Sequence, residues 1–287
     1  MLATFVIGLR EGLEAALIVG IVAAFLRKRG RLDALRAVWI GVAAAVAICV
    51  AVAVGLQVLA AELPQAQQEG LETIVGAAAV VTVTYMVLWM RGHARDLKGQ
   101  LEGATASALA EGSAWALVAM AFLAVLREGF ETSVFLLAAF QAAVDPMLAG
   151  LGALIGILVA AGLGYGLYRG GIRLDLNRFF RLTGVVLVLV AAGLVMSALH
   201  SAHEAGWLNV GQQQLLDLTW LVQPGTIISA LITGVLGIQP RPTVIEVLGW
   251  LVYLIPVGLY VAWPQPRPAP RPVPAGPEQT SLPVSRS

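Results

Sequence analysis

The sequence has little of what a soluble protein or a disulfide-stabilised protein of its length needs. It contains one cysteine, Cys49, among 287 residues, which excludes an intrachain disulfide and a cysteine-based metal centre. Only 12% of its residues are charged, about half the share that a soluble domain carries. The basic residues are scattered in short segments, so the sequence gives no support for nucleic-acid binding.

What the sequence has instead is long apolar runs. Hydrophobic residues make up 59% of the chain and its mean hydropathy is +0.84, values typical of a membrane protein. The first run contains Arg10, Glu11 and Glu14 where a cleavable signal peptide would be apolar, so we expect it to be retained. Because a helix needs about 20 residues to cross the hydrocarbon core, we predict an all-α membrane protein with seven transmembrane helices, at about 2–26, 36–60, 71–90, 114–142, 147–168, 179–200 and 243–263.

The distribution of basic residues between these runs predicts the orientation of the chain. The even-numbered connections hold one basic residue, Arg241. Because cytoplasmic loops are enriched in lysine and arginine, we expect the N-terminus outside and the C-terminus in the cytoplasm, in a plasma (inner) membrane. The residues that carry this prediction follow the odd-numbered runs: Arg27, Lys28, Arg29, Arg31 and Arg36; Arg91, Arg95 and Lys98; Arg169, Arg173, Arg178 and Arg181; and Arg267, Arg271 and Arg286.

Two segments are not predicted to span the membrane. Residues 201–242 contain an apolar section at 218–237, but Gln223-Pro224-Gly225 interrupts it, and an eighth crossing would place the basic tail outside. We therefore predict an external loop with a short amphipathic or re-entrant helix. Residues 264–287 alternate proline with arginine and small residues, which is typical of a disordered tail, here on the cytoplasmic side. The membrane domain is accordingly predicted over 1–263.

One pentapeptide occurs twice, each time near the middle of a predicted helix. The copies are Arg10-Glu11-Gly12-Leu13-Glu14 and Arg127-Glu128-Gly129-Phe130-Glu131. A charged side chain at membrane depth costs roughly 2.5 to 10 kcal/mol, and such residues usually mark an ion or substrate pathway. A buried salt-bridge network that only fixes helix packing would need one glutamate per copy, whereas each copy has two. The repeated acids therefore indicate a functional site.

The repeat also predicts the architecture. Three crossings separate the starts of the two copies, so the second copy runs through the membrane in the opposite sense. We expect a 3+3 inverted repeat, with repeat one at about 1–98 and repeat two at about 112–200, and one additional helix at 243–263. Transporters with this plan bind their substrates near the midplane, at the interface between the repeats.

The spacing within each copy predicts its chemistry. Residues at i and i+3 share one helix face, so each copy presents two carboxylates together. Carboxylate oxygens suit hard cations, whereas thiolates and thioethers select soft metals. Each arginine stands at i to a glutamate at i+4, a spacing that allows an ion pair within the copy. The small residues Gly8, Gly12 and Ala16, and likewise Gly129 and Ser133, predict close packing against neighbouring helices.

Polar residues at the predicted outer ends form two further candidates. Glu69 and Glu72 repeat the Glu-x-x-Glu spacing, either as an entry site for the ion or as a solvated helix start where acids favour the N-terminal dipole. His200, His203 and Glu204 stand at i, i+3 and i+4, which fits an accessory metal site, although interfacial histidines are often only hydrogen-bonded.

The two pentapeptides are similar to the hallmark of the oxidase-dependent iron permease family, and the chain resembles its bacterial Efe-type members most. The resemblance extends over nearly the whole chain, through Trp89-Met90-Arg91, Phe122–Glu131, His200–Trp207 and Pro240-Arg241-Pro242. It implies iron transport across seven spans. It also implies a metal role for four glutamates and a supporting role for two arginines: Glu11, Glu14, Glu128 and Glu131, and Arg10 and Arg127. Phe130 departs from the first copy, and the external Asp-Ala-Ser-Glu motif of fungal members is absent.

On this basis we expect a permease rather than an enzyme, with iron as its transported substrate and no organic cofactor. The resemblance implies ferric iron supplied by an extracytoplasmic oxidase or iron-delivery protein; membrane lipid is the other expected partner. Three alternatives stay open at this point: a permease for another hard divalent metal such as manganese, a metal sensor that does not transport, and an intramembrane metal hydrolase. The separated positions of the acids and the absence of a His-Glu-x-x-His order argue against the hydrolase.

Overall fold

The protein is described by a computed structural model that covers residues 1–28, 30–61, 63–93, 114–143, 145–169, 175–220, 222, 229, 232–233 and 236–263. Within these ranges it is all-helical, apart from an isolated bridge between Gln214 and Thr243. The helices are α1 (Leu2–Lys28), α2 (Leu32–Ala61), α3 (Gln65–His93), α5 (Ala114–Gln141), α6 (Pro146–Tyr168), α7 (Leu176–Glu204) and α9 (Val244–Ala262).

Five of these helices, α2, α3, α6, α7 and α9, contain a stretch long and apolar enough to cross a membrane. α1 and α5 are as long, with 27 and 28 residues, but each carries the three charged side chains of a pentapeptide. The all-helical prediction is confirmed for the described ranges. The predicted tail at 264–287 and most of the predicted re-entrant section at 218–237 lie outside them.

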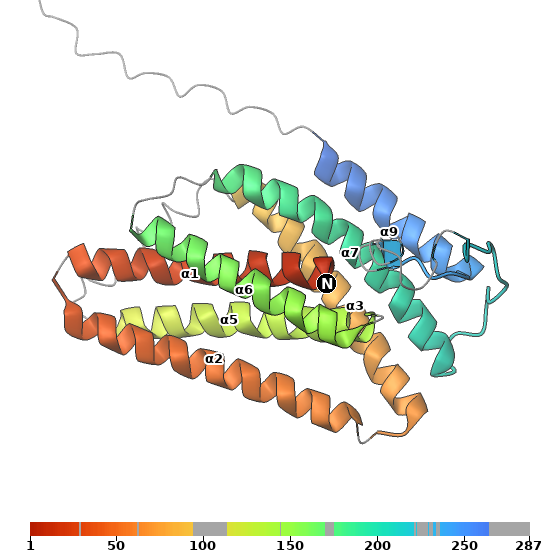
Figure 1. Cartoon of the computed structure of the whole chain (residues 1–287), viewed down its shortest axis with the longest axis horizontal. Coiled ribbons are helices and arrows are strands. Elements are labelled where there is room, and N and C mark those ends of the chain that lie inside the picture. Colours follow the sequence, from red (N-terminus) through yellow and green to blue (C-terminus); the bar gives the residue numbers. More distant parts are fainter. Residues whose placement is uncertain are drawn as a thin grey trace, which may run out of the picture.

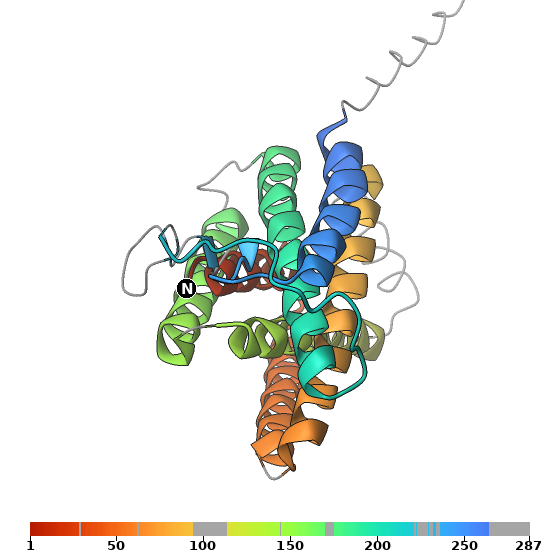
Figure 2. The same ribbon diagram turned by 90° about the vertical axis from the view of Figure 1, so that its right-hand side faces the viewer.

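The helices pack in pairs that join distant parts of the chain. α1 lies along α6, α2 along α5, and α3 along α7, while α9 covers α7. Figures 1 and 2 show α1, α2 and α5 as one group and α3, α7 and α9 as a second group inclined to it. α1 contacts α5 as well, so the two helices that carry the pentapeptides are neighbours.

Small residues make the α1–α6 contact close. A side chain at Gly156 would collide with the backbone carbonyl oxygen of Phe5, and one at Gly8 would lie 2.7 Å from the carbonyl oxygen of Ala153. Ala16 faces Gly164 in the same way, at 2.5 Å from the position of an added Cβ atom. The small-residue stripe of the first helix therefore permits close packing, as the sequence predicted.

The helix ends are defined by local signals. Asp145 caps α6 by accepting a hydrogen bond from the Leu148 N–H at 3.0 Å, and Pro146 follows it in the first turn. At the start of α9, Glu246 accepts a hydrogen bond from the Thr243 N–H at 2.9 Å. Gly30, with φ of 70°, forms the turn between α1 and α2.

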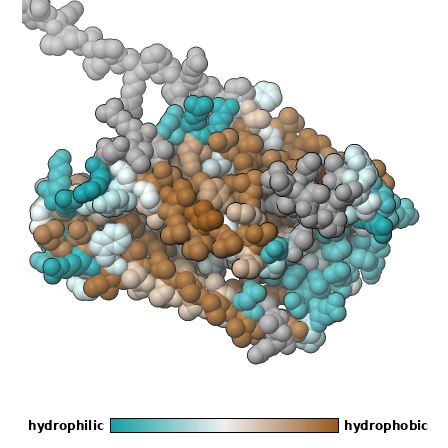
Figure 3. All heavy atoms as spheres, viewed as in Figure 1, coloured by the Kyte–Doolittle hydropathy of each residue, from teal (hydrophilic) through white to brown (hydrophobic). Residues whose placement is uncertain are grey.

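The outer surface is widely apolar. Figure 3 shows hydrophobic residues over the middle of the molecule and hydrophilic residues toward both ends. On α2 the side chains of Val46, Val50, Val54 and Val58 all point outward. An exposed apolar surface of this extent is incompatible with water on all sides, and lipid is its natural environment.

Candidate metal centre

The two pentapeptides lie on neighbouring helices that run in opposite directions. Figure 1 shows α1 leading away from the marked N-terminus toward the turn into α2, while α5 runs back alongside it. Glu11 of α1 and Glu128 and Glu131 of α5 each place a carboxylate oxygen within 4.8 Å of those of the other two. Acids that stand far apart in the sequence thus converge between two helices.

Two of these carboxylates are deeply buried and have oxygens without hydrogen-bond partners. Glu11 is 0% exposed and Glu128 is 5% exposed. Both oxygens of Glu11 and Oε2 of Glu128 have no hydrogen-bond partner in the described part of the chain. A buried polar atom without a partner costs about 1–3 kcal/mol, and more if it is charged. Oxygens in this condition are available as ligands for a cation, which would offset that cost.

An arginine is paired with the last glutamate of each copy. The Arg10 Nε atom lies 3.2 Å from Glu14 Oε1, and the Arg127 Nε atom lies 2.9 Å from Glu131 Oε1. Both predicted i, i+4 ion pairs are therefore confirmed. Glu131 still belongs to the converging group, whereas Glu14 does not.

The two arginines lie in different surroundings. Arg10 is 1% exposed and its guanidinium carbon lies 6.0 Å from the centre of the Phe180 ring of α7. The side chain of Arg127 is 59% exposed. The sequence does not distinguish these environments, because the same residue precedes the same acids in each copy.

The central glycine of each pentapeptide is a packing contact. A Cβ atom at Gly12 would lie 2.9 Å from the Cβ atom of Ala160 on α6. A Cβ atom at Gly129 would lie 2.6 Å from the sulfur of Cys49 on α2. The lone cysteine is thus buried against the second pentapeptide, where its thiol donates to the Leu126 carbonyl oxygen at 3.6 Å. A larger residue at either glycine would therefore push α6 or α2 away from the pentapeptide.

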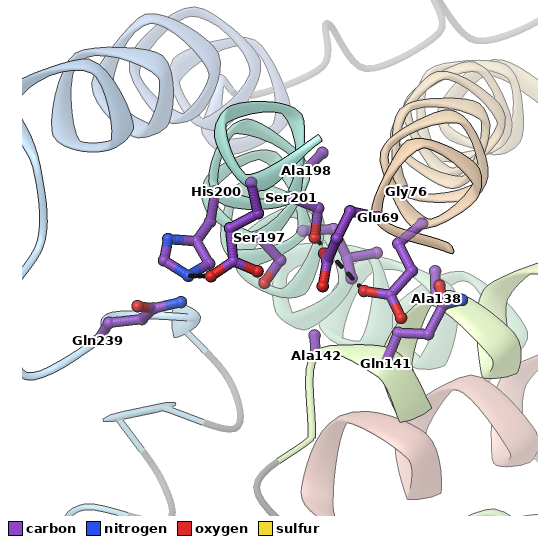
Figure 4. A pocket seen from close by; sticks show the side chains of 13 residues that line it. Glu69, Gly76, Ala138, Gln141, Ala142, Ser197, Ala198, His200, Ser201 and Gln239 are labelled. Carbon is purple, nitrogen blue, oxygen red and sulfur yellow. Dashed lines mark hydrogen bonds and ion pairs between the residues drawn. The ribbon is translucent and has the colours of Figure 1, made fainter. Parts of the chain in front are cut away.

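The outer candidates lie around a cavity of about 240 Å³ between α3, α5 and α7. Figure 4 shows His200 and Ser201 of α7 and Glu69 of α3 at this cavity. Its acidic lining consists of Glu69, Glu72 and Glu204, so the structure brings both predicted outer groups together. It does not include His203, whose Nδ1 atom instead lies 2.9 Å from the Leu208 carbonyl oxygen.

Sequence reasoning missed Glu246 of α9. This residue is 2% exposed, and its Oε1 atom lies 2.9 Å from Nδ1 of His200. It follows Thr243 with the spacing of a capping box, which explains a helix start and gives no sign of the contact with a histidine 46 positions earlier.

The fold and the buried acids define a class: a multi-pass helical membrane protein with a cluster of buried carboxylates inside its helix bundle. Within that class, residues 1–264 match the iron permease FTR1 family. The chain belongs to this family, whose members are permeases. The resemblance deduced from the pentapeptides is therefore confirmed, and so is the assignment to iron transport.

Individual relatives cover nearly the whole chain. A protein of Shigella sonnei named ferrous iron permease EfeU is 44% identical over 266 residues, which are 92% of this chain and 96% of that protein. A protein of the same name from Escherichia coli O157:H7 has the same identity and coverage. Its namesake from Yersinia pestis is 43% identical over 258 residues, or 89% and 91% of the two chains. No solved structure matches the chain.

Proposed function

We propose that the protein imports iron across the plasma membrane through a carboxylate site formed by its two pentapeptides. The observation that carries this proposal is the convergence of Glu11, Glu128 and Glu131 from two antiparallel helices, with buried oxygens that lack partners. Family membership supports the choice of iron.

In the proposed site all four glutamates of the pentapeptides contribute. Glu11, Glu128 and Glu131 form the primary ligand group. Glu14 is held by Arg10 and joins when a cation competes with that ion pair. Arg10 and Arg127 are supporting charges that partly neutralise the acids while no iron is bound. Because carboxylates are hard ligands, the site favours ferric iron over softer divalent metals.

The proposed architecture has seven spans, an inverted repeat over α1–α3 and α5–α7, and the additional helix α9. The pattern of helix contacts supports it. In this repeat α1, α2 and α3 correspond to α5, α6 and α7. The contact between α1 and α6 therefore corresponds to the contact between α5 and α2, and both contacts are extensive. The α1–α5 and α3–α7 pairs each map onto themselves. The proposed membrane domain, 1–263, has its N-terminus outside and its C-terminus in the cytoplasm.

The oxidation state of the iron belongs to the same proposal. The relatives are named ferrous iron permeases, whereas resemblance to the oxidase-dependent family and the all-oxygen ligand set favour ferric iron at the transport site. We propose that ferrous iron arriving at the membrane is oxidised by an extracytoplasmic partner and then carried as ferric iron. Flux measured with ferrous iron kept reduced by ascorbate, and with ferric citrate, separates the two.

Iron uptake into proteoliposomes tests the function. Wild type should transport iron, Glu14→Gln and Glu131→Gln should each transport less, and the double variant should be inactive. Equal transport by all four proteins would contradict the proposal. Stronger competition by manganese than by unlabelled iron would indicate a manganese permease, and iron binding without flux would indicate a sensor.

A further inference from the structure

The outer cavity has the composition of a metal site that is separate from the central acids. Its donors come from two helices: the carboxylates of Glu69 and Glu72 from α3, and the Glu204 carboxylate and the His200 imidazole from α7. Ser201 donates to Glu72 Oε2 at 3.4 Å. Among the described residues that line the cavity there is no lysine or arginine, so nothing basic there neutralises the three acids except His200.

His200 is oriented in the way that metal-binding histidines usually are. Its Nδ1 atom faces the buried carboxylate of Glu246 at 2.9 Å, and its Nε2 atom lies 3.4 Å from Glu204 Oε1. With Nδ1–H donating to Glu246, Nε2 presents its lone pair beside a carboxylate oxygen. A second carboxylate that fixes the tautomer and ring orientation is the usual partner of a ligating histidine.

The position of Glu246 is itself well determined. Its second oxygen accepts a hydrogen bond from the Thr243 N–H at 2.9 Å, at the start of α9. A buried carboxylate that is held by a helix N-terminus on one side and by a histidine on the other has little freedom to turn away. α9, which stands outside the pentapeptide repeats, thereby acquires a role in positioning His200.

The cavity also adjoins the helix that leads to the central acids. Ala138, Gln141 and Ala142, at the end of α5, form part of its lining. Glu131 lies seven positions before Ala138 on that helix, which corresponds to about 10 Å along the helix axis at a rise of 1.5 Å per residue. A cation released from the cavity would need to move roughly two helical turns to reach the proposed transport site.

We propose that Glu69, Glu72, Glu204 and His200 form a second cation site, which captures iron before it enters the central site, with Glu246 as a positioning residue. As a capture site for iron it rests on the proposed function; as a metal site it rests on the lining of the cavity and on the orientation of His200. Three carboxylates and one imidazole suit a ferrous or ferric ion, which accept both oxygen and nitrogen ligands.

Binding of Tb³⁺ to the purified full-length protein tests the site directly, because tryptophan excitation sensitises Tb³⁺ emission at short range. Trp207 is the built-in donor: its Cζ2 atom lies 2.8 Å from the position of a Cβ atom at Gly70, the residue after Glu69. The measurement uses a Glu11→Gln/Glu128→Gln background, in which the central site is disabled, so that emission reports the outer site alone.

We expect saturable Tb³⁺ emission in this background, reduced by Trp207→Phe and displaced by Fe²⁺ under anaerobic conditions. Glu69→Gln, Glu204→Gln and His200→Asn should each weaken Tb³⁺ binding at least about tenfold, and Glu246→Gln should weaken it about 10- to 100-fold. His203→Asn is the matched control, since His203 stands on the same helix but outside the cavity, and it should bind Tb³⁺ normally. Thermal unfolding of each variant separates lost ligands from lost folding.

Absence of emission in the background protein, or equal affinity in the cavity variants and His203→Asn, would overturn the proposal. In transport, Glu69→Gln and Glu204→Gln should raise the half-saturating iron concentration several-fold while leaving the rate at saturating iron within about twofold. A lower saturating rate with unchanged half-saturation would contradict a capture role. If wild-type protein bound Tb³⁺ in the cavity but transported no iron, the proposed function would fail while the outer site stood.

Discussion

In α1 the pentapeptide lies in the centre of the molecule, whereas in α5 the same arrangement lies at its edge. Arg10 and Leu13 of the first copy are buried, and α1 contacts both α6 and α7. Their counterparts Arg127 and Phe130 are largely exposed, Phe130 to 53%. The glutamates do not follow this division, because Glu11 and Glu128 are both buried and face the same space.

The difference separates what the repeat preserves from what it does not. The first glutamate is buried in both copies, and the central glycine is a close helix contact in both, with α6 at Gly12 and α2 at Gly129. The arginine and the fourth residue of the pentapeptide are buried in the first copy and exposed in the second. We infer that the acids and glycines carry the shared function and that the two arginines contribute unequally to stability.

The largest effect should come from the acids, and it should be equal in the two copies. Glu11→Gln and Glu128→Gln each keep the size of the side chain but remove a charged ligand, so each should lower the initial rate of iron uptake into proteoliposomes roughly 100-fold or more. Metal-site mutations beyond the direct ligands already cost 10- to 100-fold. Uptake that depends on the acid of one copy only would show that the two pentapeptides do not share one site.

Replacing the two arginines should lower the stability of the protein by different amounts. Arg10→Gln leaves the largely buried Glu14 carboxylate without its partner, which should lower the free energy of unfolding by about 3–5 kcal/mol. Arg127→Gln also leaves Glu131 without its partner, but the Arg127 side chain is itself largely exposed, so the loss should be smaller, about 1–3 kcal/mol. Denaturant unfolding in detergent measures both. Similar losses for the two variants would show that Arg127 is also covered in the folded protein.

The glycines should again behave alike. Alanine at Gly12 or at Gly129 overpacks a helix contact and should cost about 1–3 kcal/mol. The obstructing atoms are the Cβ of Ala160 and the sulfur of Cys49, so Ala160→Gly should restore stability to Gly12→Ala, and Cys49→Ala to Gly129→Ala. Thermal unfolding of the singles and doubles checks this; a double variant no more stable than its glycine single would exclude the contact as the cause.

The smallest effect should come from Phe130→Leu, which makes the two pentapeptides identical. Because Phe130 points outward, this change should alter the free energy of unfolding by less than about 0.5 kcal/mol and leave iron uptake unchanged. The reverse change, Leu13→Phe, places a phenyl ring, larger than the leucine side chain, at a fully buried position. It should lower the free energy of unfolding by about 1–3 kcal/mol. A functional loss in Phe130→Leu would assign the phenyl ring a role in the site.

Much of this arrangement was predictable because helical spacing determines local neighbours. The ion pairs at i, i+4 and the small-residue stripe follow from the sequence alone. Helix length was less accessible: hydropathy predicts a span from 71 to 90, whereas α3 extends over Gln65–His93. Its polar first turns continue the helix beyond the apolar stretch and carry Glu69 to the outer cavity.

Contacts between distant segments could not be read from spacing. Glu246 stands in an apolar helix far from His200, and Cys49 stands in another, so neither is marked as a neighbour of a polar site. His203 shows the converse, since its spacing from His200 suits a shared ligand while its ring is engaged by the Leu208 carbonyl. The contrast between Arg10 and Arg127 likewise depends on which helices cover them.

Acids from both pentapeptides should bind one and the same iron ion. X-ray absorption at the iron edge can check this on iron-loaded protein in which the outer cavity is disabled by Glu69→Gln and Glu204→Gln. We expect one bound ion with a carboxylate-like first shell and no imidazole or sulfur signal, lost equally on adding Glu11→Gln or Glu128→Gln. Bound iron that survives the loss of either copy's acid, or that shows imidazole or sulfur ligands, would mean that the two pentapeptides do not share one carboxylate site.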